Sequence, residues 1–142
     1  MLLLQKNYAD EMVSHAFDED PNECCGILAG QGGRVTKLYR VTNLEHSPYR
    51  YSMDPKDLLS ITQEIDDNQW ELLAIYHSHT HTQAYPSSTD VRMATWPDGK
   101  SIWPDTHYIL VSLMDKKNPV VRAFLIEDGI IREEGLRIIE EK

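Results

Sequence analysis

The spacing of apolar residues predicts two amphipathic helices in the first half of the chain. In each of them, apolar side chains recur at i, i+3, i+4 and i+7, which places them along one helix face. The two stripes are Ala9, Met12, Val13 and Ala16, and then Leu58, Ile61, Thr62 and Ile65. We expect the first helix over residues 5–17, because Pro21 and the acidic residues before it stop it. Asp54 caps the second helix, Pro55 lies in its first turn, and Asn68 ends it.

Short apolar runs bounded by turn residues predict a sheet. The expected strands cover residues 23–29, 35–41, 49–52, 72–76, 106–112, 120–127 and a segment from residue 130 onward. The glycine-rich turn at 30–33 and the pair Asp128-Gly129 predict hairpins. Residues 90–95 suit a short helix, residues 96–105 suit a loop, and the tail from Ile138 is short and charged.

These elements predict one α+β (mixed α/β) domain over residues 1–142. Two longer helices and one short helix combine with a sheet made mostly of antiparallel hairpins. A chain of this length buries roughly 68–70% of its unfolded surface, so it needs no disulfide or structural metal to hold a core.

Charge and cysteine content indicate which binding partners and which cellular compartment suit the protein. The net charge of −9 and pI of about 5.0 argue against a nucleic-acid or anionic-membrane surface, because both attract Lys and Arg. Cys24 and Cys25 are adjacent, which disfavours a disulfide between them and suits a reducing compartment. The apolar run at residues 2–4 is too short for a signal peptide, so we expect a cytoplasmic protein.

The candidate chemistry lies directly after the expected strand at 72–76. His77 and His79 are two residues apart, so they point to the same face of a strand. Ser87 and Asp90 form a helix entry that turns Asp90 back towards them. Three N and O ligands with an open fourth position are what a catalytic zinc needs. Taken alone, Asp90 is a simple capping acid and one His-x-His pair is weak evidence, but together they indicate a metal site.

The pattern His-x-His, seven residues, Ser-x-x-Asp resembles the core motif of the JAMM metallopeptidases, also called the MPN-plus family. His77, His79, Ser87 and Asp90 match it position by position, and Glu23 fits the family's glutamate at the start of an early strand. The resemblance covers nearly the whole chain and is strongest with small bacterial members. It implies a curved, mostly antiparallel sheet packed with helices.

The resemblance also implies a function and roles for the motif residues. His77, His79 and Asp90 would bind one catalytic Zn²⁺, with a water as the fourth ligand. Glu23 would carry a proton from that water to the leaving amine, and Ser87 would stabilise the oxyanion. The expected reaction is hydrolysis of a peptide or isopeptide bond at the C-terminal glycine of a small ubiquitin-like or sulfur-carrier protein, for example to release cysteine.

Two other classes of function stay open on the sequence. A non-catalytic MPN-type interaction module is the first, although such relatives generally lack one or more of the metal-binding residues. A cysteine hydrolase that uses Cys24 or Cys25 is the second and less favoured, since adjacent residues of a strand point to opposite faces. His81 continues the alternation of His77 and His79, but as a fourth ligand it would close the site.

The loop from Trp96 to Trp103 is the segment that departs most from the small bacterial members. Its two tryptophans either anchor the loop on the core or form a wall of the substrate cleft.

Overall fold

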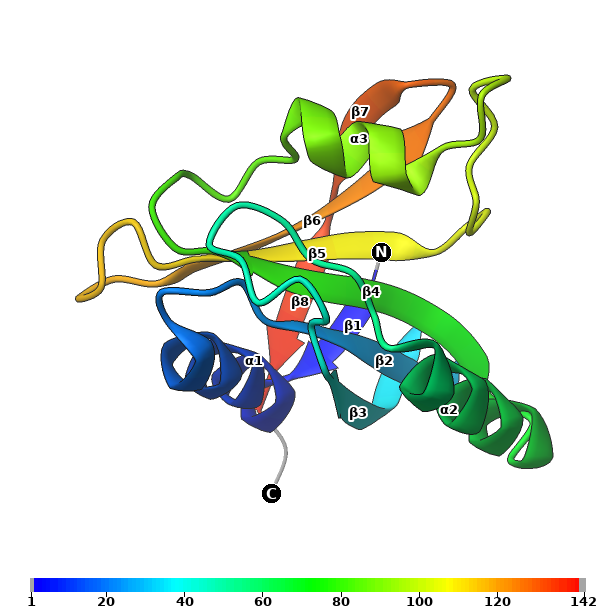
Figure 1. Cartoon of the computed structure of the whole chain (residues 1–142). Coiled ribbons are helices and arrows are strands. Elements are labelled where there is room, and N and C mark those ends of the chain that lie inside the picture. The colour runs from blue at the N-terminus through cyan, green and yellow to red at the C-terminus, as the bar shows by residue number, and fades with distance from the viewer. Residues whose placement is uncertain (1, 141–142) are drawn as a thin grey trace.

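The computed structural model describes residues 2–140 and contains one mixed sheet with three helices (Figure 1). The helices are α1 (Lys6–Glu19), α2 (Pro55–Asp67) and α3 (Ser88–Ala94). The strands are β1 (Leu2–Gln5), β2 (Cys25–Gln31), β3 (Arg34–Val41), β4 (Glu71–His79), β5 (His107–Ser112), β6 (Val120–Glu127), β7 (Ile130–Glu134) and β8 (Leu136–Ile139). None of the described helices has the length and apolar character that crossing a membrane requires.

The sheet curves so strongly that one segment of chain reaches both of its edges. The strand order is β7-β6-β5-β4-β2-β3-β1-β8, with four antiparallel and three parallel pairs. Only Gly135 separates β7 from β8, yet these strands stand at opposite ends of that order. A flat sheet cannot satisfy both facts, so the edges must bend towards each other, as the long bent red and orange segment in Figure 1 shows.

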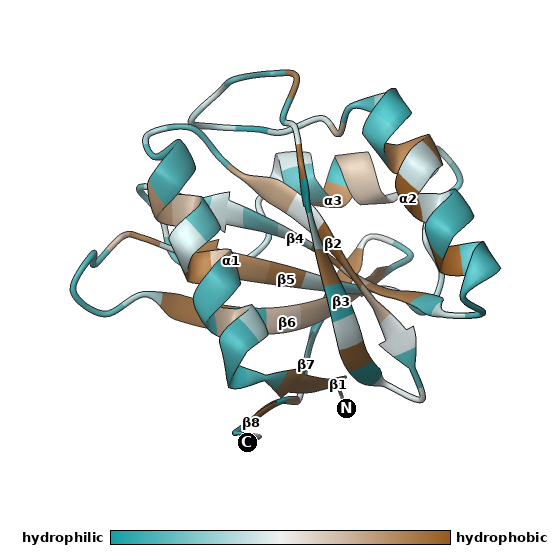
Figure 2. Ribbon diagram, turned by 90° about the horizontal axis from the view of Figure 1, so that it is seen from below, coloured by the Kyte–Doolittle hydropathy of each residue, from teal (hydrophilic) through white to brown (hydrophobic). Residues whose placement is uncertain are grey.

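The helices divide between the two faces of this curved sheet (Figure 2). α1 packs its stripe, including Met12 and Ala16, against Leu28 and Tyr76 in one core cluster. α2 packs Ile61 and Ile65 against the opposite face in a second cluster. α3 contributes Ala94 to a third cluster with Ile75, which lies on the same face as α2 because it alternates with Tyr76. The centre of the sheet is therefore covered on both sides, and β4 runs through it.

The helix predictions and most of the strand predictions are confirmed within a few residues. Asp54 accepts a hydrogen bond from the backbone N–H of Lys56, Pro55 opens α2, and Asn68 is its C-cap. The α+β class with a mostly antiparallel curved sheet is also confirmed.

One strand prediction was wrong, and two short strands were not predicted. Residues 49–52 form no strand, and the nearby backbone makes only an isolated bridge between Asn43 and Met53. The apolar N-terminal residues form β1, and β8 includes Ile138 and Ile139, the first two residues of the expected charged tail. β8 pairs with β1 in parallel, and residues 141–142 of that tail lie outside the described residues. Both short strands depend on pairing between distant ends of the chain, which local patterns do not encode.

The absence of a side chain at Gly26 is a steric requirement of this packing. Gly26 pairs with Tyr76 across β2 and β4, and a Cβ atom at Gly26 would overlap the buried Tyr76 ring. We predict that Gly26→Ala lowers the free energy of unfolding by about 1–3 kcal/mol, the usual cost of overpacking a core. Urea unfolding measures this loss of unfolding free energy. The loss should be smaller in a Tyr76→Leu background, because the ring that the new Cβ would overlap is then absent. A variant as stable as the wild-type protein would contradict this packing.

Candidate metal centre

The two histidines of the motif lie within the last residues of β4, at the centre of the sheet. β4 pairs with β2 on one side and β5 on the other, so its backbone is fixed along both edges. His77 and His79 alternate with Ser78 and therefore project from the same face, the face that α2 and α3 cover. Their side chains are 1% and 5% exposed, which makes them part of the interior.

Asp90 reaches the histidines from the first turn of α3. Ser87 is the N-cap of this helix: its hydroxyl accepts from the N–H of Asp90 at 3.0 Å, and Oδ2 of Asp90 accepts from the N–H of Ser87 at 2.9 Å. This reciprocal capping box fixes the carboxylate beside β4. The predicted helix entry is confirmed, and its acidic residue, Asp90, also contacts both histidines.

Three atoms that can ligate a metal converge at this point. Nε2 of His77 lies 3.3 Å from Nε2 of His79, and Oδ2 of Asp90 lies 3.1 Å from the first nitrogen and 2.9 Å from the second. Two nitrogens bound at about 2.0–2.1 Å to a tetrahedral zinc would lie roughly 3.3 Å apart. The cluster is thus a candidate metal site whose spacing suits zinc.

The tautomer of His79 strengthens this assignment. Its Nδ1 lies 2.9 Å from the carbonyl oxygen of Gln83, and a carbonyl can only accept, so Nδ1 carries the proton. In a neutral ring, Nε2 then presents a lone pair to the carboxylate of Asp90. Buried acceptors that face each other are costly unless a proton or a metal cation lies between them.

The charges of the cluster agree with a site for a cation. Burial would raise the pKa of Asp90, but the neighbouring His77 and His79 outweigh it and hold this pKa well below its usual range. Burial acts to lower the pKa of His79, but the hydrogen bond with Asp90 outweighs it and raises this pKa. The carboxylate therefore stays ionised and favours any positive charge placed beside it.

Glu23 lies at the edge of this cluster without ligating it. Its backbone N–H donates to Ser47, and its carbonyl oxygen accepts from the side chain of Asn43, so the loop after β3 fixes its position. Its side chain is buried, and Oε1 has no hydrogen-bond partner in the described part of the chain. Burial first, and then the charge of Asp90, raise the pKa of Glu23 to about 8. Such a carboxyl can hold or release a proton near neutral pH.

Several supporting residues escaped the sequence analysis. The Tyr51 ring stacks on His77, with centroids 4.6 Å apart, and holds a ring whose Nδ1 is buried without a hydrogen bond. Oδ1 of Asn43 accepts from the N–H groups of Glu45 and Ser52 and so shapes the loop that carries Tyr51. These contacts join segments distant in sequence, and no local pattern marks them.

The remaining candidates lie outside the cluster. His81 is exposed, and its Nδ1 contacts the Thr80 hydroxyl. Cys24 and Cys25 belong to core clusters on opposite faces of the sheet, and burial raises the pKa of each thiol to about 12. Neither cysteine can supply a thiolate at neutral pH, which argues against a cysteine hydrolase.

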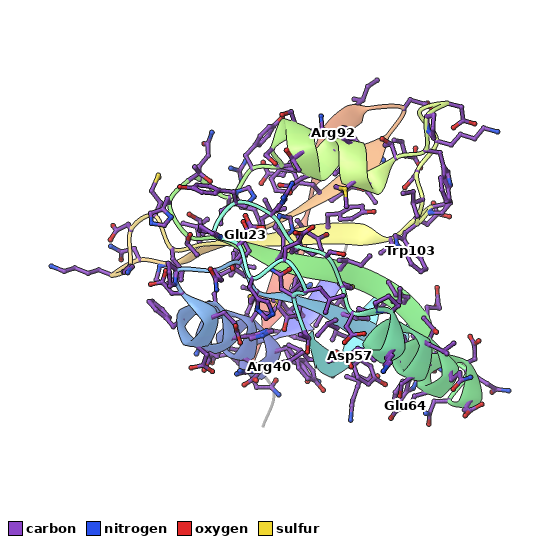
Figure 3. The ribbon with its side chains drawn as sticks, in the orientation of Figure 1. Glu23, Arg40, Asp57, Glu64, Arg92 and Trp103 are labelled. Atoms are coloured by element: carbon purple, nitrogen blue, oxygen red, sulfur yellow. The ribbon has the colours of Figure 1, made fainter. Side chains whose placement is uncertain are left out.

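The two tryptophans of the long loop have different environments. Trp103 is partly buried and packs on the cluster that contains Ile75 and Tyr108, so it anchors the loop (Figure 3). Trp96 is 55% exposed.

Comparison with known proteins agrees with the geometry. A family model described as prokaryotic homologs of the JAB domain matches residues 5–127. The CysO-cysteine peptidase of Mycobacterium tuberculosis is 38% identical over 99% of this chain and 93% of that protein. The desampylase of Haloferax volcanii is 34% identical over 68% of this chain and 74% of that protein. The solution structure of a Desulfitobacterium hafniense protein is 36% identical, with a TM-score of 0.84 over 99% of this chain and 94% of that one.

The chain therefore belongs to the prokaryotic JAB-domain family, the JAMM or MPN family that its motif resembles. Its relatives include the CysO-cysteine peptidase, and the similarity to the Desulfitobacterium hafniense structure covers 99% of this chain.

Metal content provides the first test of the site. We predict that protein purified without chelator binds about one zinc per chain, and that His79→Ala loses tight binding because one of three ligands is gone. His81→Ala is the matched control and should retain the metal, since this ring is exposed and outside the cluster. Elemental analysis after dialysis measures both. Zinc loss in His81→Ala with retention in His79→Ala would contradict the ligand set.

The buried carboxyl of Glu23 predicts a pH-dependent stability of the metal-free protein. The folded protein holds a proton on Glu23 up to a pKa of about 8, whereas the unfolded chain releases it near 4.5. The contribution of Glu23 to the free energy of unfolding is therefore fully present below pH 4.5 and is lost as the pH rises through 8. Glu23→Gln should gain stability relative to wild type across this interval.

Urea unfolding at about pH 5 and about pH 9 measures that gain, because the linkage acts between the two pKa values. Glu71→Gln, at an exposed position in β4, is the control and should show no such trend. A Glu23→Gln difference that stays constant with pH would show that Glu23 is ionised throughout.

Proposed function

We propose that the protein is a zinc metallopeptidase that hydrolyses the bond after the C-terminal glycine of a small ubiquitin-like or sulfur-carrier protein. One observation carries the proposal: His77, His79 and Asp90 converge on one point in the interior, beside an unpartnered carboxyl on Glu23. Three protein ligands leave a tetrahedral zinc one open position, which is the arrangement of a catalytic site.

The proposed proton carrier is Glu23. Bound zinc supplies Lewis acidity, which lowers the pKa of a water in the open position and polarises the substrate carbonyl. Glu23 takes a proton from the attacking water and gives it to the leaving amine, so that the C–O bond forms and the C–N bond breaks with no net change at Glu23. The raised pKa of Glu23 supports this role, because an acid–base group works best near the operating pH.

Ser87 is the proposed donor to the oxyanion. Its oxygen already accepts from the N–H of Asp90, and its own hydroxyl proton stays free to donate. Ser87 is exposed at the N-terminus of α3, so a substrate carbonyl can reach it. Donors of this kind contribute about 2.7–4 kcal/mol to stabilising the transition state.

A groove beside Asp90 supports an extended substrate tail. It has a volume of about 220 Å³, and Arg50 and Tyr51 of the loop after β3 face Arg92 and Met93 of α3 across it. A small C-terminal tail ending in glycine suits such a narrow groove. The relatives named after CysO-cysteine and desampylation point to the same class of substrate. We place the reaction in the cytoplasm because the adjacent Cys24 and Cys25 suit a reducing compartment.

The direct test is cleavage of a defined conjugate. We predict that the zinc-loaded protein releases the amino acid from the sulfur-carrier protein encoded nearest to it, and that a chelator stops the reaction. Mass spectrometry of the carrier before and after reaction measures it. Tight zinc binding without cleavage of any amino-acid or lysine conjugate would instead support a non-catalytic module.

Substitution of the proposed proton carrier separates chemistry from metal binding. Glu23→Gln should keep about one zinc per chain and lower kcat by at least about 10²-fold, because only the acid–base group is lost. Glu71→Gln, which removes an exposed carboxyl of β4, should cleave as the wild-type protein does. Normal turnover by Glu23→Gln would refute this role for Glu23.

A further inference from the structure

A second hollow lies next to the tail groove, between α2, α3 and the sheet. Its volume is about 200 Å³. Ile75 of β4 forms part of its wall, and Ile75 points to the same face of the sheet as His77 because the two alternate along the strand. The Tyr51 ring, which stacks on His77, lines the hollow as well. The hollow therefore lies on the face that carries the metal ligands.

Two residues connect this hollow with the tail groove. Tyr51 and Met93 line both of them. Along α3, Asp90 lines the groove and Ala94 lines the hollow, so the two follow each other along the helix, away from the metal ligand. Met93 is 57% exposed, and its unbranched side chain adapts easily to a neighbour. A tail in the groove can therefore extend past Met93 to the hollow.

The lining of the hollow is apolar and carries no charge. Although 26% of the chain is charged, no Asp, Glu, Lys, Arg or His is among the lining residues in the described part of the chain. Burial raises the pKa of Tyr108 in its wall to about 12, so this hydroxyl is neutral at pH 7. A carboxylate placed here would lose its hydration without gaining a cationic partner. The aliphatic and aromatic members of the lining include Met53, Leu58, Ile75, Ala94 and Trp103.

The size and position of the hollow suit one side chain of an extended tail. Its volume lies below the range of about 300–1,000 Å³ that holds a drug-sized molecule. From Asp90 to Ala94 a helix rises about 6 Å, at about 1.5 Å per residue. An extended chain covers that distance in about two residues, at roughly 3.3 Å each. Given the proposed function, we propose that this hollow is a specificity subsite for one apolar side chain of the tail, two or three residues before the terminal glycine.

Trp103 forms a fixed wall of this subsite. The backbone N–H of Ile102 donates to the carbonyl of Ala94 at 2.9 Å, and the N–H of Thr106 donates to the carbonyl of Trp103 at 3.2 Å. These bonds attach the long loop to α3 on one side and lead it into β5 on the other. Figure 3 shows Trp103 at this end of the loop, between α3 and α2. Trp103 thus both anchors the loop and faces the substrate, which joins the two roles that the sequence left open.

The test scans the tail of the substrate. The zinc-loaded protein is given the carrier protein joined to cysteine, with each of the four residues before the terminal glycine changed in turn to Leu, Ala or Asp. We expect one position, two or three residues before that glycine, where the Leu conjugate exceeds the Ala conjugate by at least about tenfold in kcat/KM. The Asp conjugate should be the poorest there, because its charge is desolvated.

Trp103→Leu tests the wall itself. The smaller side chain leaves part of the subsite empty, so the ratio of Leu to Ala cleavage at the selected position should fall towards one. A purely structural role of Trp103 would lower all conjugates alike and leave that ratio unchanged. Trp96→Leu is the matched control, the same substitution in the same loop at a residue that lines neither hollow. This variant should keep the wild-type ratio.

Ala94→Leu changes the subsite in the opposite direction and does not depend on the loop. Ala94 is 3% exposed and lines the hollow, so a longer side chain there fills the space that the substrate would use. The preference should then reverse, with the Ala conjugate cleaved faster than the Leu conjugate. Zinc content of the same sample reports whether the centre beside α3 is intact.

Two results would overturn the subsite. One is a wild-type protein that cleaves the Leu and Ala conjugates equally at every scanned position. The other is a ratio that both Trp103→Leu and Ala94→Leu leave unchanged. Failure of the proposed function has a different signature, since the zinc-loaded wild-type protein would then cleave none of these conjugates.

Discussion

The structure depends on a close meeting of three atoms that can ligate a metal, all in the protein interior. Nε2 of His77, Nε2 of His79 and Oδ2 of Asp90 lie within 3.3 Å of one another, in a region with almost no exposure to solvent. Nitrogen and carboxylate lone pairs this close repel each other unless a proton or a metal cation lies between them. The fold therefore supplies a binding site whose geometry makes sense only with a positive charge at its centre.

The surrounding fold provides the rigidity that this arrangement requires. β4 carries both histidines and is fixed by β2 and β5 on its two sides, while the capping box of α3 fixes Asp90. The loop after β3 reaches the same place from a third direction, stacking Tyr51 on His77 and holding the backbone of Glu23. Three separate segments thus converge, and the groove beside Asp90 lies between two of them, the loop after β3 and α3.

The sequence could predict what depends on local periodicity. The stripes of α1 and α2, the alternation of His77 with His79 and the Ser87–Asp90 cap all follow from spacing of 3.6 or 2 residues. The pairing of β1 with β8 could not be predicted, because it joins the two ends of the chain. The roles of Asn43 and Tyr51 were also out of reach, since each acts through contacts with residues far away in sequence.

X-ray absorption at the zinc edge of the metal-loaded protein tests the central claim most directly. The account predicts two imidazole nitrogens and oxygen ligands at about 2.0–2.1 Å, with no sulfur, because His77, His79 and Asp90 form the site. A sulfur ligand at about 2.3 Å would place the metal on Cys24 or Cys25 and contradict the account. A third imidazole would contradict it as well, since that ligand would close the position where the reaction must occur.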